Sequence, residues 1–242
     1  MTDRALVLVH DAVPGRGAAE VGSLTPALAE LGYDVLVATF LPGGPPIPDP
    51  AGITVLVVLG SAAAADDDSL PWLAPERAYV TRAVEHGTPV LGICFGAQLL
   101  ARVLGGTVGR APRPERGFVR LTSADPDALA DGEWMQFHND SFTMPPGAEL
   151  LAANEIGVQA FRHGRHLGVQ FHPEITPTAF AAWVDAWRVT GELAAVAATV
   201  DLPALTAEVA ARADTSAAAC RDLVHRFCAS QAASQPAGHP LR

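Results

Sequence analysis

Cysteine is scarce in this sequence, whose 242 residues include three, Cys94, Cys220 and Cys228. So small and odd a set does not build the disulfide framework of a small secreted protein. Basic residues are also in deficit, because 16 Lys and Arg face 26 Asp and Glu for a formal net charge of −10. Nucleic-acid-binding domains carry a basic face, so we expect no nucleic-acid partner.

Long apolar runs are lacking as well. No uninterrupted stretch approaches the roughly 20 residues that a membrane-spanning helix needs. The N-terminal apolar run is broken by His10 and Asp11, which does not fit a signal peptide. Hydrophobic residues still make up 49% of the chain, enough for a sizeable core. We therefore predict a soluble, cytoplasmic protein with no membrane contact, of a length that suits one α/β domain with an appendage.

Short apolar runs alternate with helical patterns through the first half of the chain. This alternation predicts an α/β fold with a doubly wound, mostly parallel central sheet covered on both faces by right-handed crossovers. Strands are expected at 5–9, 34–38, 53–59 and 90–93, and helices at 18–31, 75–87 and 95–104.

The second half of the chain has a different pattern, with shorter and partly antiparallel strands and a hairpin whose turn contains Gly164. Strands are expected at 118–121, 134–137, 149–153, 158–162 and 166–170, and helices at 178–188, 202–212 and 216–230. We divide the chain into a main domain (1–189), a helical C-terminal extension (190–230), expected to dock on the domain or on a partner, and a flexible tail (231–242).

One cysteine lies between two glycines, in the segment Gly92-Ile93-Cys94-Phe95-Gly96, where an expected strand ends and a helix begins. Such a sharp turn lifts a nucleophile clear of the sheet, as in the G-x-S-x-G elbow, and small neighbours let the backbone pass. The helix N-terminus favours a thiolate, and open α/β sheets bind ligands at the carboxyl ends of their strands. Cys94 is therefore our candidate nucleophile, in preference to a cysteine that only packs.

A thiol nucleophile needs a general base, and the base needs a group that orients it. The segment 169–174, VQFHPE, supplies both, because His172 ends an apolar strand and Glu174 follows two residues later. Pro173 stiffens the backbone between them. The sequence therefore predicts a Cys94–His172–Glu174 triad, whose roles are defined by geometry and not by chain order.

The stretches GICFGAQLLA and GVQFHPE together resemble the class I glutamine amidotransferases, over roughly residues 4–187. The finer resemblance is to stand-alone, GMP-synthase-like domains, and segments 115–118 (ERGF) and 137–142 (FHNDSF) support it. The resemblance implies the flavodoxin-like fold of that family for residues 1–189, and neither cofactor nor metal. It also implies that Cys94 attacks the side-chain amide of glutamine, while His172 moves the proton and Glu174 holds His172. A γ-glutamyl thioester then forms and is hydrolysed, releasing glutamate and ammonia.

The tetrahedral intermediates of this reaction carry an oxyanion that needs preorganised donors. The resemblance implies two backbone donors, the N–H of Phe95 and an N–H from a Gly-Gly-Pro loop. That loop reads Gly60-Ser61-Ala62 here, so Ser61 takes the second glycine's place. If the position needs a positive φ, Ser61 is strained there, and the oxyanion hole would assemble only when a partner binds.

Substrate contacts are also implied by the resemblance. Gln98 lies one helical turn after Cys94 and on the same face. Gly60, His138, Asn139 and Asp140 border the same pocket, although His138 is equally well explained as a loop histidine that satisfies a backbone group.

Other polar residues receive plainer interpretations. His10 is expected to be a solvated loop histidine, and His163 and His166 to be exposed beside the hairpin turn. Residues 66–68, three aspartates, are expected to be a solvated run that caps the next helix and not a metal site. Cys220 and Cys228 lie eight residues apart on one helix face, which indicates packing.

Three functions remain open. The first is a glutaminase that acts on glutamine and whose ammonia serves an acceptor on a separate synthase. The second is a γ-glutamyl hydrolase or peptidase, because the same triad attacks any γ-glutamyl amide. The third is a non-catalytic regulatory protein that keeps the fold; the altered loop at Gly60-Ser61-Ala62 favours it and the intact triad opposes it.

Overall fold

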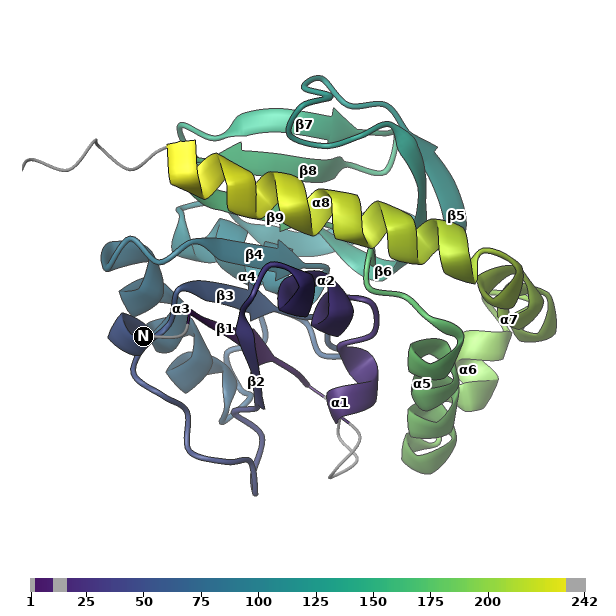
Figure 1. Cartoon of the computed structure of the whole chain (residues 1–242). Helices are drawn as coiled ribbons and strands as arrows, with labels where there is room; N and C mark the ends of the chain where they lie inside the picture. Colours follow the sequence, from purple (N-terminus) through teal and green to yellow (C-terminus); the bar gives the residue numbers. More distant parts are fainter. Residues whose placement is uncertain (1–2, 11–16, 234–242) are drawn as a thin grey trace, which may run out of the picture.

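A central sheet organises the molecule (Figure 1), in a computed structural model that describes residues 3–10 and 17–233. Within these residues the sheet has seven strands in the order β2-β1-β3-β4-β9-β8-β7. The first five strands are parallel, and the last two pairings, β9 with β8 and β8 with β7, are antiparallel. This confirms the predicted α/β fold with a mostly parallel sheet. In sheet order the strands are Asp34–Ala38, Arg4–Leu8, Val55–Val58, Val90–Ile93, His166–Val169, Val158–His163 and Glu149–Ala153.

Helices cover both faces of this sheet. On one face α2 (Leu24–Glu30) and α8 (Ala213–Ala233) pack side by side, and on the other lie α3 (Leu73–Glu85) and α4 (Phe95–Val103). Strand β1 divides its side chains between the two, because Ala5 and Val7 pack on the α2–α8 side whereas Leu6 and Leu8 face α3 and α4. Burial on both faces is why these strands read as continuous apolar runs.

The single helix expected at 18–31 is wrong, because the structure forms two helices there, α1 (Gly17–Glu20) and α2. Gly22 separates them with φ 51°, and a Cβ at this position would lie 2.0 Å from the carbonyl oxygen of Glu174. The next residue, Ser23, donates its N–H to that same oxygen over 3.0 Å. The break between α1 and α2 therefore allows Gly22 and Ser23 to contact the backbone carbonyl of Glu174, a candidate catalytic residue.

The strands expected at 118–121 and 134–137 belong to a longer structure than predicted. They are parts of β5 (Val108–Leu121) and β6 (Gly132–Phe142), which pair antiparallel in a two-stranded ribbon apart from the main sheet. The register shifts between Arg110 and Glu115, where two prolines remove ladder donors. Because of this interruption, the sequence pattern did not predict that the strand begins before residue 118.

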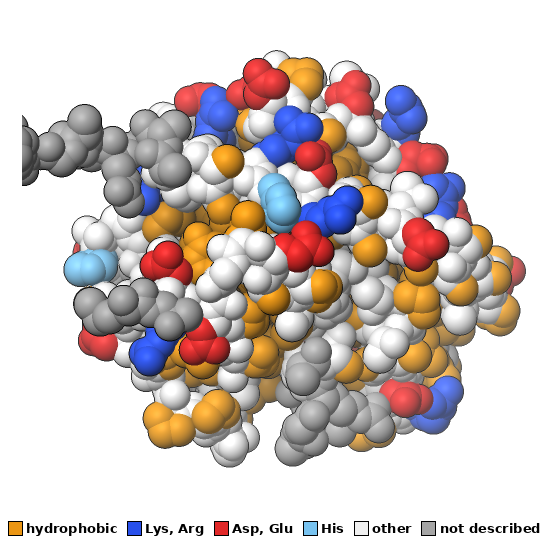
Figure 2. Space-filling model, viewed as in Figure 1, with side chains coloured by type: hydrophobic (Ala, Val, Ile, Leu, Met, Phe, Trp, Pro, Cys, Tyr) orange, Lys and Arg blue, Asp and Glu red, His pale blue; other side chains and the backbone are white. Residues whose placement is uncertain are grey.

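The C-terminal helices dock on the domain. Helices α5 (Pro177–Thr190), α7 (Leu202–Ala211) and the unpredicted α6 (Leu193–Ala197) gather beside the ribbon. Helix α8 buries Cys220, Leu223, Val224 and Phe227 in the same core as the sheet. Its outer side carries charges of both signs (Figure 2), including an Arg226–Asp222 pair at 2.7 Å.

The ends of the chain bear on two further expectations. Residues 231–233, expected to be part of the flexible tail, are the last turn of α8, and 234–242 lie outside the described residues. Among the helices described, none is both long enough and apolar enough to span a bilayer.

Candidate active site

Cys94 occupies a strained elbow between β4 and α4. Its backbone has φ 52° and ψ −109°, and it is the only non-glycine residue with positive φ in the part of the chain that the structure describes. The flanking glycines are required by close backbone approach, since a Cβ on Gly96 would lie 1.9 Å from the oxygen of Val58 and one on Gly92 would lie 2.5 Å from that of Gly96. Strain held by such packing is typical of a functional residue.

Adjacent parallel strands bring the cysteine to the histidine. Strand β4 pairs with β9 so that Ile93 lies opposite Val169, and the N–H of Cys94 donates to the Val169 carbonyl over 2.8 Å. His172 follows three residues later, with its N–H bound to the carbonyl of Met135 on β6 at 2.8 Å. Both side chains therefore emerge at the carboxyl edge of the sheet, where ligands bind in this architecture.

The His172 imidazole is tied to Glu174, as expected from the VQFHPE segment. Its Nδ1 lies 2.7 Å from Glu174 Oε1, and both side chains are almost fully buried. Burial disfavours the imidazolium, but the Glu174 carboxylate and the Cys94 sulfur outweigh it and raise the pKa of His172 to about 10. The structure thus brings the three predicted triad residues together, with the His172 imidazole between the Glu174 carboxylate and the Cys94 sulfur.

The Gly60-Ser61-Ala62 loop runs past the triad. A Cβ on Gly60 would lie 2.8 Å from Cε1 of His172, so only glycine fits. Ser61 does not adopt positive φ, so the strain expected there is absent. Its hydroxyl instead accepts the Ala63 N–H over 3.1 Å and closes a small turn. The other predicted oxyanion donor, the N–H of Phe95, is the first in α4 and has no partner within the helix.

His10 is buried, and the expectation of a solvated loop histidine is wrong. Its Nδ1 lies 2.9 Å from the carbonyl oxygen of Gly60, and its Nε2 lies 2.9 and 3.1 Å from the two oxygens of Glu76. The His10 ring also packs on Phe95, with centroids 4.8 Å apart. Burial opposes the imidazolium, but Glu76, the Gly60 carbonyl and Glu20 together raise the pKa of His10.

Gln98 lies on α4 below the cysteine, as predicted. Its side-chain amide nitrogen is 3.3 Å from the carbonyl oxygen of Asp140 and 3.2 Å from Oε1 of Gln170. Asn139 and Asp140 border the pocket from β6, and Asn139 accepts a hydrogen bond from Arg116 at 2.6 Å. Gln98, Asn139 and Asp140, three of the predicted substrate residues, thus line the same pocket as Cys94.

Arg116 is a site residue that sequence reasoning missed, although it stands in the ERGF segment. Its guanidinium lines the pocket, lies 4.3 Å from the ring centroid of Phe137 and donates to the His138 carbonyl over 2.6 Å. Burial lowers the pKa of Arg116, and the nearby Cys94 sulfur opposes that shift. A half-buried cation therefore lies within electrostatic reach of Cys94, the candidate nucleophile.

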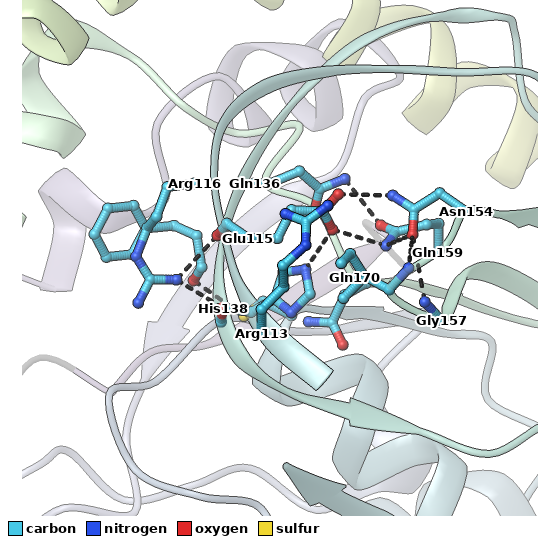
Figure 3. Close-up of polar contacts among 12 residues, drawn as sticks. Arg113, Glu115, Arg116, Gln136, His138, Asn154, Gly157, Gln159 and Gln170 are labelled. Atoms are coloured by element: carbon cyan, nitrogen blue, oxygen red, sulfur yellow. Dashed lines mark hydrogen bonds and ion pairs between the residues drawn. The ribbon is translucent and has the colours of Figure 1, made fainter. Parts of the chain in front are cut away.

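A buried polar network supports this end of the pocket (Figure 3). Glu115 accepts from Asn154 at 2.6 Å and from Gln159 at 2.9 Å, and His138 Nε2 lies 2.9 Å from it. Gln136 continues the network by donating to Gln159 over 2.8 Å. Burial alone would raise the pKa of Glu115, but these partners lower it. The sequence signals Glu115 through its ERGF motif, whereas nothing in it marks the amides.

His138 sits on a strand, with both ring nitrogens engaged. Nδ1 lies 2.9 Å from the Asp140 carbonyl, and Nε2 meets Glu115. Its ring lines the pocket, but its polar atoms face protein and not open space. We therefore expect His138 to shape the substrate pocket by holding its own strand.

The cavity that contains these residues has a volume of about 430 Å³. It extends from Cys94 and His172 outward to α5 and α6, where Trp183, Trp187 and Val196 line it. The Trp183 ring packs edge-on against the His172 imidazole at 4.7 Å, and Trp187 stacks on Phe137 at 4.9 Å. The sequence does not signal this aromatic wall, because it depends on where α5 and α6 dock.

The polar residues expected to lie outside the site differ in their surroundings. His166 is buried and not exposed, and burial lowers its pKa to about 4, with His163 and Arg165 acting in the same direction. Residues 66–68 are exposed as expected, but they do not cap α3, whose N-cap residue Trp72 makes no side-chain cap. Cys220 packs in the core as expected. No group of three or more potential metal ligands occurs among the residues described.

Comparisons with known proteins find similar sequences. The family described as glutamine amidotransferase class-I matches residues 36–186. The glutamine-hydrolyzing GMP synthase of Aeropyrum pernix is 36% identical over 173 residues, which are 66% of this chain and 32% of that protein. One glutamine-hydrolyzing GMP synthase subunit from Saccharolobus solfataricus is 43% identical over 103 residues, which are 39% of this chain and 55% of that relative. This chain thus spans about a third to a half of these relatives' lengths.

Solved structures share the fold. A glutamine amidotransferase from Thermotoga maritima superposes with a TM-score of 0.80 at 23% identity, covering 94% of this chain and 98% of that one. A glutamine amido transferase from Methylobacillus flagellatus gives a TM-score of 0.77 at 25% identity, covering 100% and 99%. The C-terminal helices are therefore included in the likeness.

Proposed function

The chain belongs to the class-I glutamine amidotransferase family, and from this premise we propose that it is a cysteine-dependent enzyme that hydrolyses the side-chain amide of glutamine. The observation that carries the proposal is the His172 imidazole, held 2.7 Å from Glu174 beside the strained Cys94. An imidazole held beside a thiol is placed to take its proton and so to generate the thiolate, which is the nucleophilic form.

The reaction follows from these positions. The Cys94 thiolate attacks the amide carbon, and the carbonyl electrons move onto oxygen, where the N–H groups of Phe95 and Ser61 stabilise the oxyanion. The intermediate collapses as the C–N bond breaks, and the imidazolium of His172 gives its proton to the leaving ammonia. Water, deprotonated by His172, then cleaves the γ-glutamyl thioester to glutamate and regenerates Cys94.

The glutamate part of the substrate lies toward β6 in this proposal. Gln98 and the Asp140 carbonyl border the region, Gly60, His138 and Asn139 line it, and Arg116 provides the cation. A guanidinium pairs well with a carboxylate, so we assign the substrate α-carboxylate to Arg116. The ammonia would serve an acceptor bound on another domain or chain, in line with the synthase names of the relatives.

A second candidate, hydrolysis of larger γ-glutamyl amides, is favoured by the shape of the cavity. Its volume of about 430 Å³ extends past His172 to Trp183, Trp187 and Val196. An apolar amine attached to the γ-carbonyl would fit this wall. The third candidate, a non-catalytic regulatory protein, was suggested by the altered Gly60-Ser61-Ala62 loop, and the absence of a positive φ at Ser61 removes one argument for it.

One experiment tests these candidates. Purified protein is incubated with glutamine and with γ-glutamyl amides of small and aromatic amines, and glutamate is measured; the γ-glutamyl adduct on the Cys94 peptide is sought by mass spectrometry. We expect turnover in the wild type and in the matched control Cys228→Ala, and none in Cys94→Ala. Activity that survives in Cys94→Ala contradicts the mechanism. Preference for the aromatic amide, lost in Trp187→Ala, identifies the second candidate as the function.

A further inference from the structure

His10 touches both elements that carry the proposed oxyanion donors. Its Nδ1 lies 2.9 Å from the carbonyl oxygen of Gly60, in the loop that contains Ser61, and its ring packs on Phe95. The residue follows β1 and is separated from Gly60 by 50 positions in the chain. A histidine at the end of a neighbouring strand thus bridges the loop and the start of α4.

The atom that His10 meets belongs to the same peptide unit as the Ser61 N–H. In a trans peptide the carbonyl and the following N–H lie in one plane and point in opposite directions, and the described residues contain no cis peptide. A hydrogen bond to the Gly60 oxygen therefore fixes where the Ser61 N–H points.

Glu76 holds His10 in turn. Its carboxylate is fully buried and lies 2.9 and 3.1 Å from His10 Nε2. Because a carbonyl and a carboxylate are both acceptors, the ring donates from both nitrogens. The ring also contacts Trp72, at a centroid distance of 5.4 Å, and the His10 N–H donates to Glu20. Every polar atom of the imidazole is thereby engaged in one orientation.

We propose that His10 and Glu76 are a positioning pair that orients the Gly60–Ser61 peptide, so that its N–H stabilises the oxyanion formed at Cys94. The pair does not touch substrate and acts through the loop. This inference rests on the proposed function, because an oxyanion forms only if Cys94 attacks an acyl carbon.

Two substitutions separate the two hydrogen bonds of the ring. In His10→Asn the amide nitrogen falls where Nδ1 was and still donates to the Gly60 oxygen, but Glu76 loses its partner. In His10→Gln the amide nitrogen replaces Nε2 and keeps Glu76, but the Gly60 oxygen loses its donor. A positioning role requires the asparagine variant to be the more active, whereas a structural role makes it the worse one, since it leaves a buried carboxylate unpaired.

The experiment measures kcat on the best γ-glutamyl amide, the rate of Cys94 alkylation by iodoacetamide, and Tm for each variant. Alkylation displaces iodide without an oxyanion, so it reports the thiolate alone. Losing an oxyanion donor lowers kcat by about 10²–10³-fold, so we expect His10→Gln to lose about 10²-fold with KM and alkylation nearly unchanged. We expect His10→Asn to recover at least about tenfold of that loss while melting at a lower temperature.

The outcomes are distinct. Equal kcat in the wild type and His10→Gln, or a kcat that follows Tm across the variants, overturns the proposal. An alkylation rate that falls in parallel with kcat also overturns it, because the defect would then lie in the thiolate. A wild type with no turnover on any amide refutes the proposed function itself and is visible before any variant is made.

Discussion

The substitution Gly60→Ala tests how much displacement of the His172 imidazole or of the Gly60 loop the enzyme tolerates. The added Cβ would lie 2.8 Å from Cε1 of His172 and 3.6 Å from Cβ of Cys94. Non-bonded carbon atoms prefer about 3.5–4.0 Å, so the ring or the loop must move by about 0.7–1.2 Å. A misplacement of about 1 Å costs about 10²-fold in rate, which corresponds to about 2.7 kcal/mol of lost transition-state stabilisation.

The assay for Gly60→Ala is steady-state hydrolysis of the best γ-glutamyl amide, with Gly52→Ala as the matched control. Gly52 is exposed, and its added Cβ would meet nothing within 4 Å. We expect kcat to fall about 10²-fold in Gly60→Ala and to stay unchanged in Gly52→Ala. A Gly60→Ala enzyme within about threefold of the wild type would show that the imidazole tolerates displacement, and the geometric argument would fail.

Three further predictions concern charge, packing and recognition. Because the pKa of His172 is raised to about 10, the stability from its ion pair is complete below pH 6.5 and is lost as pH rises toward 10. Urea unfolding should therefore show the advantage of the wild type over Glu174→Gln shrinking across that window, and a pH-independent advantage would contradict it. Leu223→Ala empties a buried site on α8 and should cost about 2–5 kcal/mol, whereas the exposed Arg221→Ala should cost less than about 0.5 kcal/mol. Arg116→Met should raise KM for glutamine about tenfold or more, but not KM for 4-aminobutanamide, which lacks the α-carboxylate; equal effects on both would exclude the assigned contact.

The parts of the site that could be predicted from sequence are local. Cys94 is marked by its two glycines and by the strand before it, and His172 and Glu174 stand two residues apart. The segment with Cys94 and the segment with His172 and Glu174 both follow strands of the predicted parallel sheet. Chain connections in such folds allow few strand orders, so the two strand ends were expected to lie close together. The hairpin around Gly164 was predicted from its glycine-containing turn, which is also a local signal, and His163 pairs with His166 across it.

What could not be predicted depends on contacts between distant segments. His10 and Glu76 are separated by 66 residues, and the pattern around each indicates only a strand end and a helix. Glu115 meets Gln159 across 44 residues. A polar residue is buried where the fold places a hydrogen-bonding partner beside it, and neither composition nor periodicity predicts that partner. The split of the expected helix at Gly22 has the same cause, a backbone contact to Glu174.

Three buried histidine–carboxylate pairs recur in the described part of the chain, and each holds a different wall of the pocket. Glu174 holds the proposed base His172 at 2.7 Å, Glu76 holds His10 against the proposed oxyanion loop at 2.9 Å, and Glu115 holds His138 beside the proposed substrate region at 2.9 Å.

Buried ion pairs add little net stability, because desolvation offsets their attraction. Stability alone therefore does not explain why three of them gather at one edge of the sheet. We attribute it to orientation: the His10 and His138 imidazoles lie 2.9 Å from the Gly60 and Asp140 carbonyl oxygens, and the His172 imidazole lies beside Gly60. The carboxylates then act through the histidines, and replacing one with its amide should lower kcat in addition to destabilising the fold.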